Sequence, residues 1–262
     1  WYPVAGLHLG LALLIPPLPA ALAIAVAVSI SIYIAPLALP IWGVPLLATL
    51  YAGLYVAAAR TMQRYFFPPL ASLQTARTFL LGALLFPIVM GVVSVAFLAA
   101  FSIWPFGSDA WLSAIGRWAL GEAASILTVT PLVALLGWSM HPAYAERGIS
   151  WIEWVPASFT DRGVYLIEWM LVPLALYLAF FLSEFLVPQY YVCFVPVLWM
   201  ALRHGLPAAS AVVFAMALGI SLVIPFNPPL ESLIELQLFL VVLASTGLLV
   251  WMLISERNRA QS

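Results

Sequence analysis

Long apolar runs, separated by short polar or proline-rich stretches, limit what this chain can fold into. Hydrophobic residues make up 65% of the 262 residues and charged residues 7%. Soluble domains carry about 25% charged residues, so this chain has too few charges for a water-facing surface. Only helices and closed barrels satisfy their backbone hydrogen bonds in lipid, and runs such as 78–103 are too long for barrel strands. The sequence therefore predicts an all-α, polytopic transmembrane helical bundle.

The apolar stretches are expected to form about eight to nine membrane segments, some of them short or broken by proline. They span residues 4–15, 20–34, 45–59, 78–103, 111–139, 164–186, 190–202, 207–224 and 233–255. Between them we expect a loop over 35–44, connectors over 60–77 and 140–163, and a tight turn at 203–205. Residues 1–255 then form one integral membrane domain, and 256–262 begin a connector to a missing effector domain.

Arginine placement predicts the orientation of the bundle. All nine basic residues are arginine, and only Arg117 lies outside residues 60–77, 140–163, 203–205 and 256–262. Alternating helices put those four stretches on one side, whereas the opposite side carries acidic residues and no arginine: Asp109, Glu231 and Glu235, with Glu184 close by. Because arginine accumulates on the cytoplasmic side, we expect a cytoplasmic C-terminus. Trp1 then lies outside, so a chain that starts in the cytoplasm needs one more helix before it.

Residues 111–139 place Arg117 and Glu122 inside apolar sequence. An ionised carboxylate at that depth costs at least about 3 kcal/mol unless it is paired, hydrated or protonated. Trp118, Glu122 and Ser125 share one helix face. We expect this helix in the middle of the bundle, with Glu122 facing protein or trapped water. Two interpretations stay open: a buried structural pair that fixes helix register, or a ligand-binding or signalling role.

Small residues and prolines predict how the helices pack. Gly121, Ser125 and Thr128 form a stripe that lets another helix approach closely. Four prolines are expected inside helices, where each frees a backbone carbonyl and permits a kink: Pro87, Pro131, Pro173 and Pro196. Such kinks suit a bundle that moves, but they also occur in static bundles.

Residues for cofactor chemistry are few. The chain has no glycine-rich phosphate loop, no histidine–carboxylate spacing of a zinc hydrolase, and a single cysteine, Cys193. No two of its three histidines lie on one predicted helix, which disfavours a bis-histidine haem. We therefore expect no metal and no cofactor. His8 is expected to be a satisfied core histidine, with a contact to Glu122 as the alternative.

A second group of residues lies in FVPVLWMALRHG, residues 194–205. Trp199 and Arg203 are four residues apart and share a helix face, so the indole ring can cover the arginine stem. Arg203 is expected at the cytoplasmic end, where it can reach lipid phosphates or cap the carbonyls of its own helix. A role limited to setting topology would also explain it.

Three segments resemble one family, the first class of the MASE domains, which are bacterial membrane-associated sensors. WYPVAGLHLGLALL resembles the tryptophan–proline–glycine entry of that family. RWALGEAASILTVTPLVALLGW resembles its tryptophan–glycine–acidic–proline helix, with Glu122 where aspartate is usual. FVPVLWMALRHGLPAAS resembles its proline–tryptophan–arginine–glycine segment, with His204 where an aromatic residue is common.

The resemblance implies a membrane-embedded sensory input domain in the cytoplasmic membrane of a bacterium, and not an enzyme. In that family such domains precede histidine kinases of two-component systems or enzymes of cyclic-di-GMP metabolism. The expected partners are the lipid bilayer, a small ligand or partner membrane protein, an effector domain in the same chain and a second copy in a homodimer, but no nucleic acid. The expected ligand-binding or signalling residues are Trp118, Glu122, Arg117, Ser125, Trp199, Arg203 and His8.

Two other functions remain open on the sequence. An intramembrane carboxylate with broken helices also suits a small proton-coupled transporter, although no internal repeat is visible. A membrane enzyme that acts on lipid-soluble substrates is the third possibility. Its polar groups would have to come almost entirely from Glu122, Arg117 and His8.

Overall fold

The computed structural model is almost entirely helical in the residues that it describes: 3–34, 39–66, 73–101, 103, 108–140, 159–180, 190–223 and 230–261. The helices are α1 (Pro3–Leu14), α2 (Pro17–Ile34), α3 (Gly43–Phe66), α4 (Leu73–Ala100), α5 (Ser108–Met140), α7 (Phe159–Trp169), α8 (Leu171–Phe180), α9 (Phe194–Val223) and α10 (Leu230–Gln261). A short 3-10 helix, η2 (Tyr190–Cys193), precedes α9. The all-α prediction is confirmed.

The number of segments that could cross a membrane roughly matches the prediction. Seven described helical spans are long and apolar enough to do so, one of them formed by α7 and α8 together, and α1 adds a shorter apolar helix, Val4–Leu14. Residues 190–222 count as a single span, but Gly205 interrupts them with non-helical backbone angles (φ 79°, ψ −165°). Such a positive φ is available to glycine at little cost. The tight turn predicted there is confirmed.

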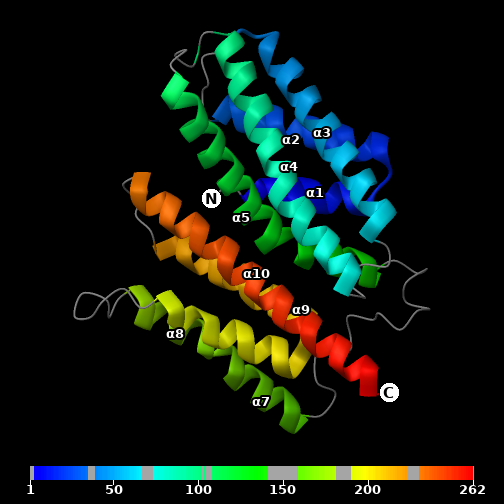
Figure 1. The fold of residues 1–262 in the computed structure, drawn as a ribbon, viewed down its shortest axis with the longest axis vertical. Helices are drawn as coiled ribbons and strands as arrows, with labels where there is room; N and C mark the ends of the chain where they lie inside the picture. The colour runs from blue at the N-terminus through cyan, green and yellow to red at the C-terminus, as the bar shows by residue number, and fades with distance from the viewer. Residues whose placement is uncertain are drawn as a thin grey trace.

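The two halves of α9 fold back on one another at this glycine. Gly247 of α10 shows this, because a methyl group built on it would lie 2.7 Å from Val197 in the first half and 3.7 Å from Val213 in the second. Sixteen residues of straight helix span about 24 Å, so Val197 and Val213 could not both reach Gly247 without the turn. In Figure 1 the second half of α9 (gold) passes behind α10, and the first half (yellow) runs below α10.

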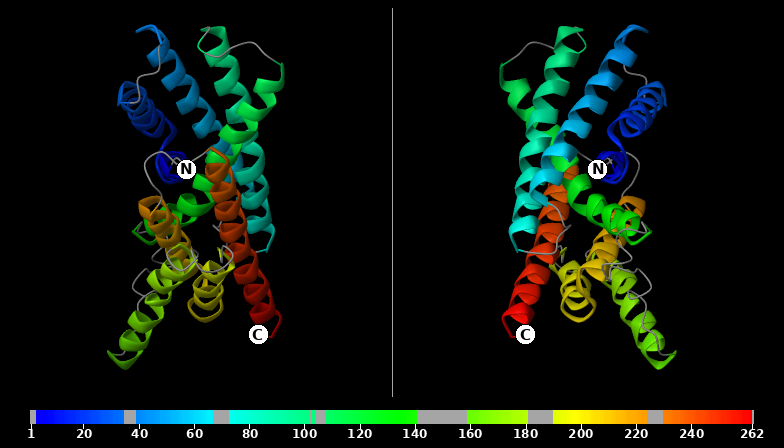
Figure 2. Two further views of the ribbon diagram at one scale, coloured as in Figure 1. Left: turned by 90° about the vertical axis from the view of Figure 1, so that its left-hand side faces the viewer. Right: turned by 90° about the vertical axis from the view of Figure 1, so that its right-hand side faces the viewer.

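The helices form two groups that meet along α5 and α10. Figure 1 shows α1 to α5 in one group and α7 to α10 in the other, and the side views of Figure 2 show the same division. α5 packs on α1, α4, α9 and α10, so it touches both groups. In its apolar window 78% of the residues are buried, against 22% to 50% in the other spans. The predicted central position of this helix is confirmed.

Several helix boundaries differ from the prediction. The connector expected over 60–77 is largely helical, because α3 continues to Phe66 and α4 begins at Leu73; Arg60, Arg64 and Arg77 therefore lie on helix ends. Nothing in RTMQRY breaks a helix. The last helix continues past residue 255 to Gln261. Most of the predicted 140–163 connector, residues 181–186 and Glu184 lie outside the described residues.

The stretch predicted as one helix over 164–186 is two helices, α7 and α8, joined at Met170. Pro173 explains the break, since it has no N–H to donate to the carbonyl of Trp169 and its ring crowds that carbonyl. Pro173 and Pro196 thus lie in the first turns of α8 and α9, whereas Pro87 and Pro131 lie inside α4 and α5.

Helix ends that carry arginine lie along one side of the molecule. The C-terminal end of α3, the N-terminal end of α4 and the C-terminal end of α10 all lie on the right in Figure 1. The C-terminal end of α4 and the N-terminal ends of α5 and α10 lie toward the opposite end. This arrangement is the one that alternating membrane crossings produce.

Candidate functional site

The site is built where α1 crosses α5 at very short distance. The Gly6 amide donates to the Ser125 hydroxyl (2.8 Å), and the Thr130 hydroxyl donates to the Gly6 carbonyl (2.8 Å). A methyl group built on Gly6 would lie 2.3 Å from the Ser125 carbonyl oxygen, and one on Gly10 would lie 2.6 Å from Val133. Small residues at i and i+4 let helix backbones approach in this way. The predicted close approach at Ser125 is confirmed, and its partner is α1.

The predicted small-residue stripe divides between different neighbours. Gly121 faces α10, where a methyl group would lie 3.2 Å from Nε2 of Gln237. The Thr128 hydroxyl turns back to its own helix and donates to the Ala124 carbonyl (2.7 Å). One helix therefore cannot cover the whole stripe, and α5 is held by α1 on one side and α10 on another.

Glu122 lies inside this packing and is 3% exposed. The hydroxyl of Tyr55, a fully buried residue of α3, donates to its carboxylate, and the side chain of Trp118 is a second hydrogen-bond partner. Within the described part of the chain Glu122 has no ion pair. The prediction that Glu122 faces protein is confirmed, and its partners are neutral donors.

Arg117 does not join this cluster. Its guanidinium donates to the Ser113 hydroxyl of the same helix (3.4 Å), and its side chain is partly exposed. Five residues separate Arg117 from Glu122, which places them about 140° apart around α5. The grouping of Arg117 with Glu122 and Trp118 is therefore not found, because the helical rotation directs the two charged residues to different faces.

His8 of α1 lies beside the cluster and is 1% exposed. Its ring packs edge-on against Tyr55, with the ring centroids 5.2 Å apart. Among the described residues neither ring nitrogen has a hydrogen-bond partner. The prediction of a satisfied core histidine was wrong, because the close α1–α5 approach fixes His8 against an aromatic ring. Its contact is with Tyr55, the donor to Glu122.

A second cluster, around the buried carboxylate of Glu168, lies at the turn between the two halves of α9. Glu168 of α7 is 7% exposed and forms an ion pair with Arg203 (3.0 Å). Its other carboxylate oxygen pairs with Nε2 of His204, and the Trp199 side chain is a further hydrogen-bond partner. These residues surround Glu168 from the first half of α9. The Arg203 side chain remains 50% exposed, so the cluster lies at the edge of the bundle.

Aromatic rings and α10 complete this cluster. The guanidinium carbon of Arg203 lies 5.8 Å from the centroid of the Trp199 ring, which confirms the predicted pair. Tyr165 packs edge-on against His204, with centroids 4.8 Å apart. A methyl group built on Gly205 would lie 3.8 Å from Nε1 of Trp251. Arg203 therefore binds a carboxylate of the same chain, and the turn beside it rests on α10.

Glu168, His204 and Tyr55 belong to these clusters but were not among the predicted site residues. Glu168 could have been found by the rule that selected Glu122, since it is also a carboxylate within an apolar stretch. Tyr55 carries no such signal, because tyrosine is common in apolar helices and only the packing of α3 against α1 and α5 brings its hydroxyl to Glu122. No group of three or more histidine, cysteine or acidic side chains within the described ranges could hold a metal ion.

Long apolar helices around two shielded carboxylates define a multi-pass helical membrane protein. Comparisons with protein-family models, curated proteins and solved structures found no match to this chain. The two clusters, and α10, which contacts the surroundings of both, are the features of this chain that point to a function.

Proposed function

We propose that this chain is a membrane-embedded sensory input domain. In this proposal a ligand or a neighbouring membrane protein changes the packing around Glu122, and α10 carries the change to a cytoplasmic effector. The observation that carries the proposal is that α10 contacts the surroundings of both clusters. Gln237 lies against Gly121, next to Glu122, and Trp251 lies against Gly205, next to His204. The resemblance of three segments to MASE domains supports the same function.

The continuity of α10 supports a relay. It is one helix of 32 residues, and its apolar span, residues 233–257, ends before the helix does. A small shift or rotation of a continuous helix moves both of its ends, and shifts of about 1–2 Å are a common form of switching. A ligand can drive such a shift only if it binds one arrangement of the helices more tightly than the other.

The hydrogen bonds of Glu122 make it the residue to test. A reporter diguanylate cyclase is fused after Gln261, and output and membrane level are measured together. Glu122→Gln and Tyr55→Phe should change output at an unchanged membrane level, because both alter the same hydrogen bond. Glu235→Gln is the matched control, since Glu235 is an exposed acid on α10. Wild-type output from both site variants would refute the role of Glu122.

A proton-coupled transporter is the second candidate. The observation that favours it is His8, whose two unpartnered ring nitrogens lie beside Tyr55 and near a buried carboxylate. Proton flux is measured with purified protein in proteoliposomes that contain a trapped pH dye. A sensor should show no flux above protein-free vesicles. A flux that Glu122→Gln abolishes would replace the sensor proposal with a carrier.

A further inference from the structure

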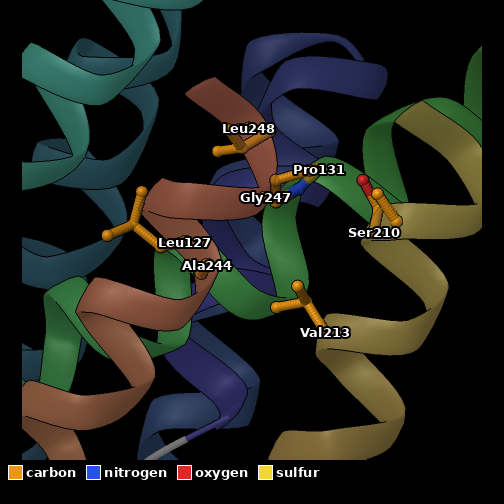
Figure 3. Close-up of a pocket in the computed structure, with 8 residues that line it drawn as sticks. Leu127, Pro131, Ser210, Val213, Ala244, Gly247 and Leu248 are labelled. Carbon is orange, nitrogen blue, oxygen red and sulfur yellow. The ribbon is translucent and has the colours of Figure 1, made fainter. Parts of the chain in front are cut away.

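The packing of α5 against α9 and α10 leaves a small cavity inside the bundle. Its volume is about 10 Å³, close to the smallest space that holds one water molecule. All residues that line it are buried. Figure 3 shows them on three helices: Leu127 and Pro131 on α5, Ser210 and Val213 on α9, and Gly247 and Leu248 on α10.

Ser210 supplies a polar atom without a partner. It is 5% exposed, and among the described residues its hydroxyl oxygen has no hydrogen-bond partner. Other serines inside these helices bond to the carbonyl four residues earlier, for example Ser29 and Ser221. A buried hydroxyl without a partner is costly, so the cavity beside it calls for a polar occupant.

Pro131 leaves a second polar atom, the Leu127 carbonyl oxygen, without its regular helical donor. It lies inside α5 and has no N–H, so the carbonyl of Leu127 loses its regular helical donor. Leu127 and Pro131 both line the cavity. Freed carbonyls in membrane helices are commonly satisfied by ordered water. A hydroxyl without a partner on α9 and a carbonyl without its regular helical donor on α5 thus belong to residues that line the same small space.

We propose that this cavity binds one ordered water molecule, which donates a hydrogen bond to the Leu127 carbonyl and bonds to the Ser210 hydroxyl. The water connects α5 to α9 and lies against α10. No larger residue at position 247 can fill the space, because a methyl group there would lie 2.7 Å from Val197. This inference is independent of the proposed sensory function.

Hydroxyl-radical footprinting by X-ray radiolysis tests the proposal on the unmodified protein in nanodiscs. A bound water is converted into a radical that oxidises the side chains around it. Leu248 lines the cavity, whereas Leu243 on the same helix is buried away from it. We expect Leu248 to be labelled several-fold faster than Leu243. Equal rates for the two leucines would mean that the cavity is dry and would overturn the proposal.

Two variants test whether the Ser210 hydroxyl and the Leu127 carbonyl hold the water. Ser210→Ala removes one partner, and Pro131→Ala returns an N–H donor to the Leu127 carbonyl; each should reduce the labelling of Leu248 to the rate of Leu243. Ser221→Ala is the control, because that hydroxyl bonds within its own helix (2.7 Å) and lies outside the cavity. Undiminished labelling in Ser210→Ala, the milder change, would also overturn the proposal.

Discussion

Glu122 and Glu168 are both shielded from solvent, but the protein stabilises them in different ways. Glu122 lies at the centre of the α1–α3–α5 packing and is held by the neutral donors Tyr55 and Trp118. Glu168 lies at the edge, where Arg203 and His204 pair with it. A tryptophan accompanies each carboxylate. The difference lies in depth, since a charged partner such as Arg203 can keep half of its side chain exposed only at the edge.

The two clusters should respond differently to the loss of a contact. The central cluster depends on close helix packing and on the hydrogen bonds of Tyr55 and Trp118 to Glu122. The peripheral cluster has several polar partners around Glu168, so the remaining ones can compensate for a lost partner. Damage to the centre should therefore cost more stability than damage to the edge, and the following four substitutions test that ranking.

Gly6→Ala should have the largest effect. Its methyl group would lie 2.3 Å from the Ser125 carbonyl oxygen, so α1 has to move away from α5. We expect a loss of about 3 kcal/mol in the free energy of unfolding, typical of severe overpacking. Unfolding by denaturing detergent in mixed micelles measures it. Gly53→Ala is the control, since nothing lies within 4 Å of its added methyl group. Equal stability of the two variants would show that close packing does not hold the centre.

Tyr55→Phe should have the next largest effect. It removes the hydroxyl that donates to Glu122 and leaves the ring contacts with His8 and Phe86 in place. Loss of one partner from a buried polar group costs about 2 kcal/mol. The same unfolding assay compares it with Tyr165→Phe at the peripheral cluster, which keeps the ring contact with His204. A larger loss for Tyr165→Phe would reverse the proposed order of centre and edge.

Gly205→Ala addresses the backbone of the peripheral cluster. The positive φ of 79° is unfavourable for any residue with a side chain, although the space around it is open enough for a methyl group. The expected loss is about 1 kcal/mol. Gly116→Ala, at a helical position with nothing within 4 Å, should instead gain about 0.5 kcal/mol. If both variants gained stability, the turn at Gly205 would be absent in the membrane.

Glu168→Gln should have the smallest effect of the four. Because Arg203 is half exposed, the ion pair is expected to contribute about 0.5 kcal/mol. A double-mutant cycle with Arg203→Gln isolates this pair, and added salt should reduce the coupling. Glu122→Gln serves as the comparison, because its neutral partners make its effect insensitive to salt. A coupling energy between Glu168 and Arg203 well above about 0.5 kcal/mol would show that Glu168 matters as much for stability as Glu122 does.

The sequence by itself determined the class of fold and the central helix. The scarcity of charge and the length of the apolar runs require membrane-spanning helices, since no other structure satisfies an unhydrated backbone in lipid. The cost of a carboxylate in apolar surroundings was enough to predict that Glu122 faces protein. The 203–205 turn and the Trp199–Arg203 pair also followed from local spacing, because residues close in sequence have their geometry fixed by the helix.

Only the tertiary structure decided which residues meet across helices. Tyr55 reaches Glu122, Glu168 reaches Arg203, and Gln237 lies against Gly121, although long stretches of chain separate each pair. Sequence spacing gives the face of a helix on which a residue lies, but not the neighbour that covers that face. That neighbour is chosen by the summed packing of all the helices, in which glycines such as Gly6 and Gly205 set the closest approaches and the turns.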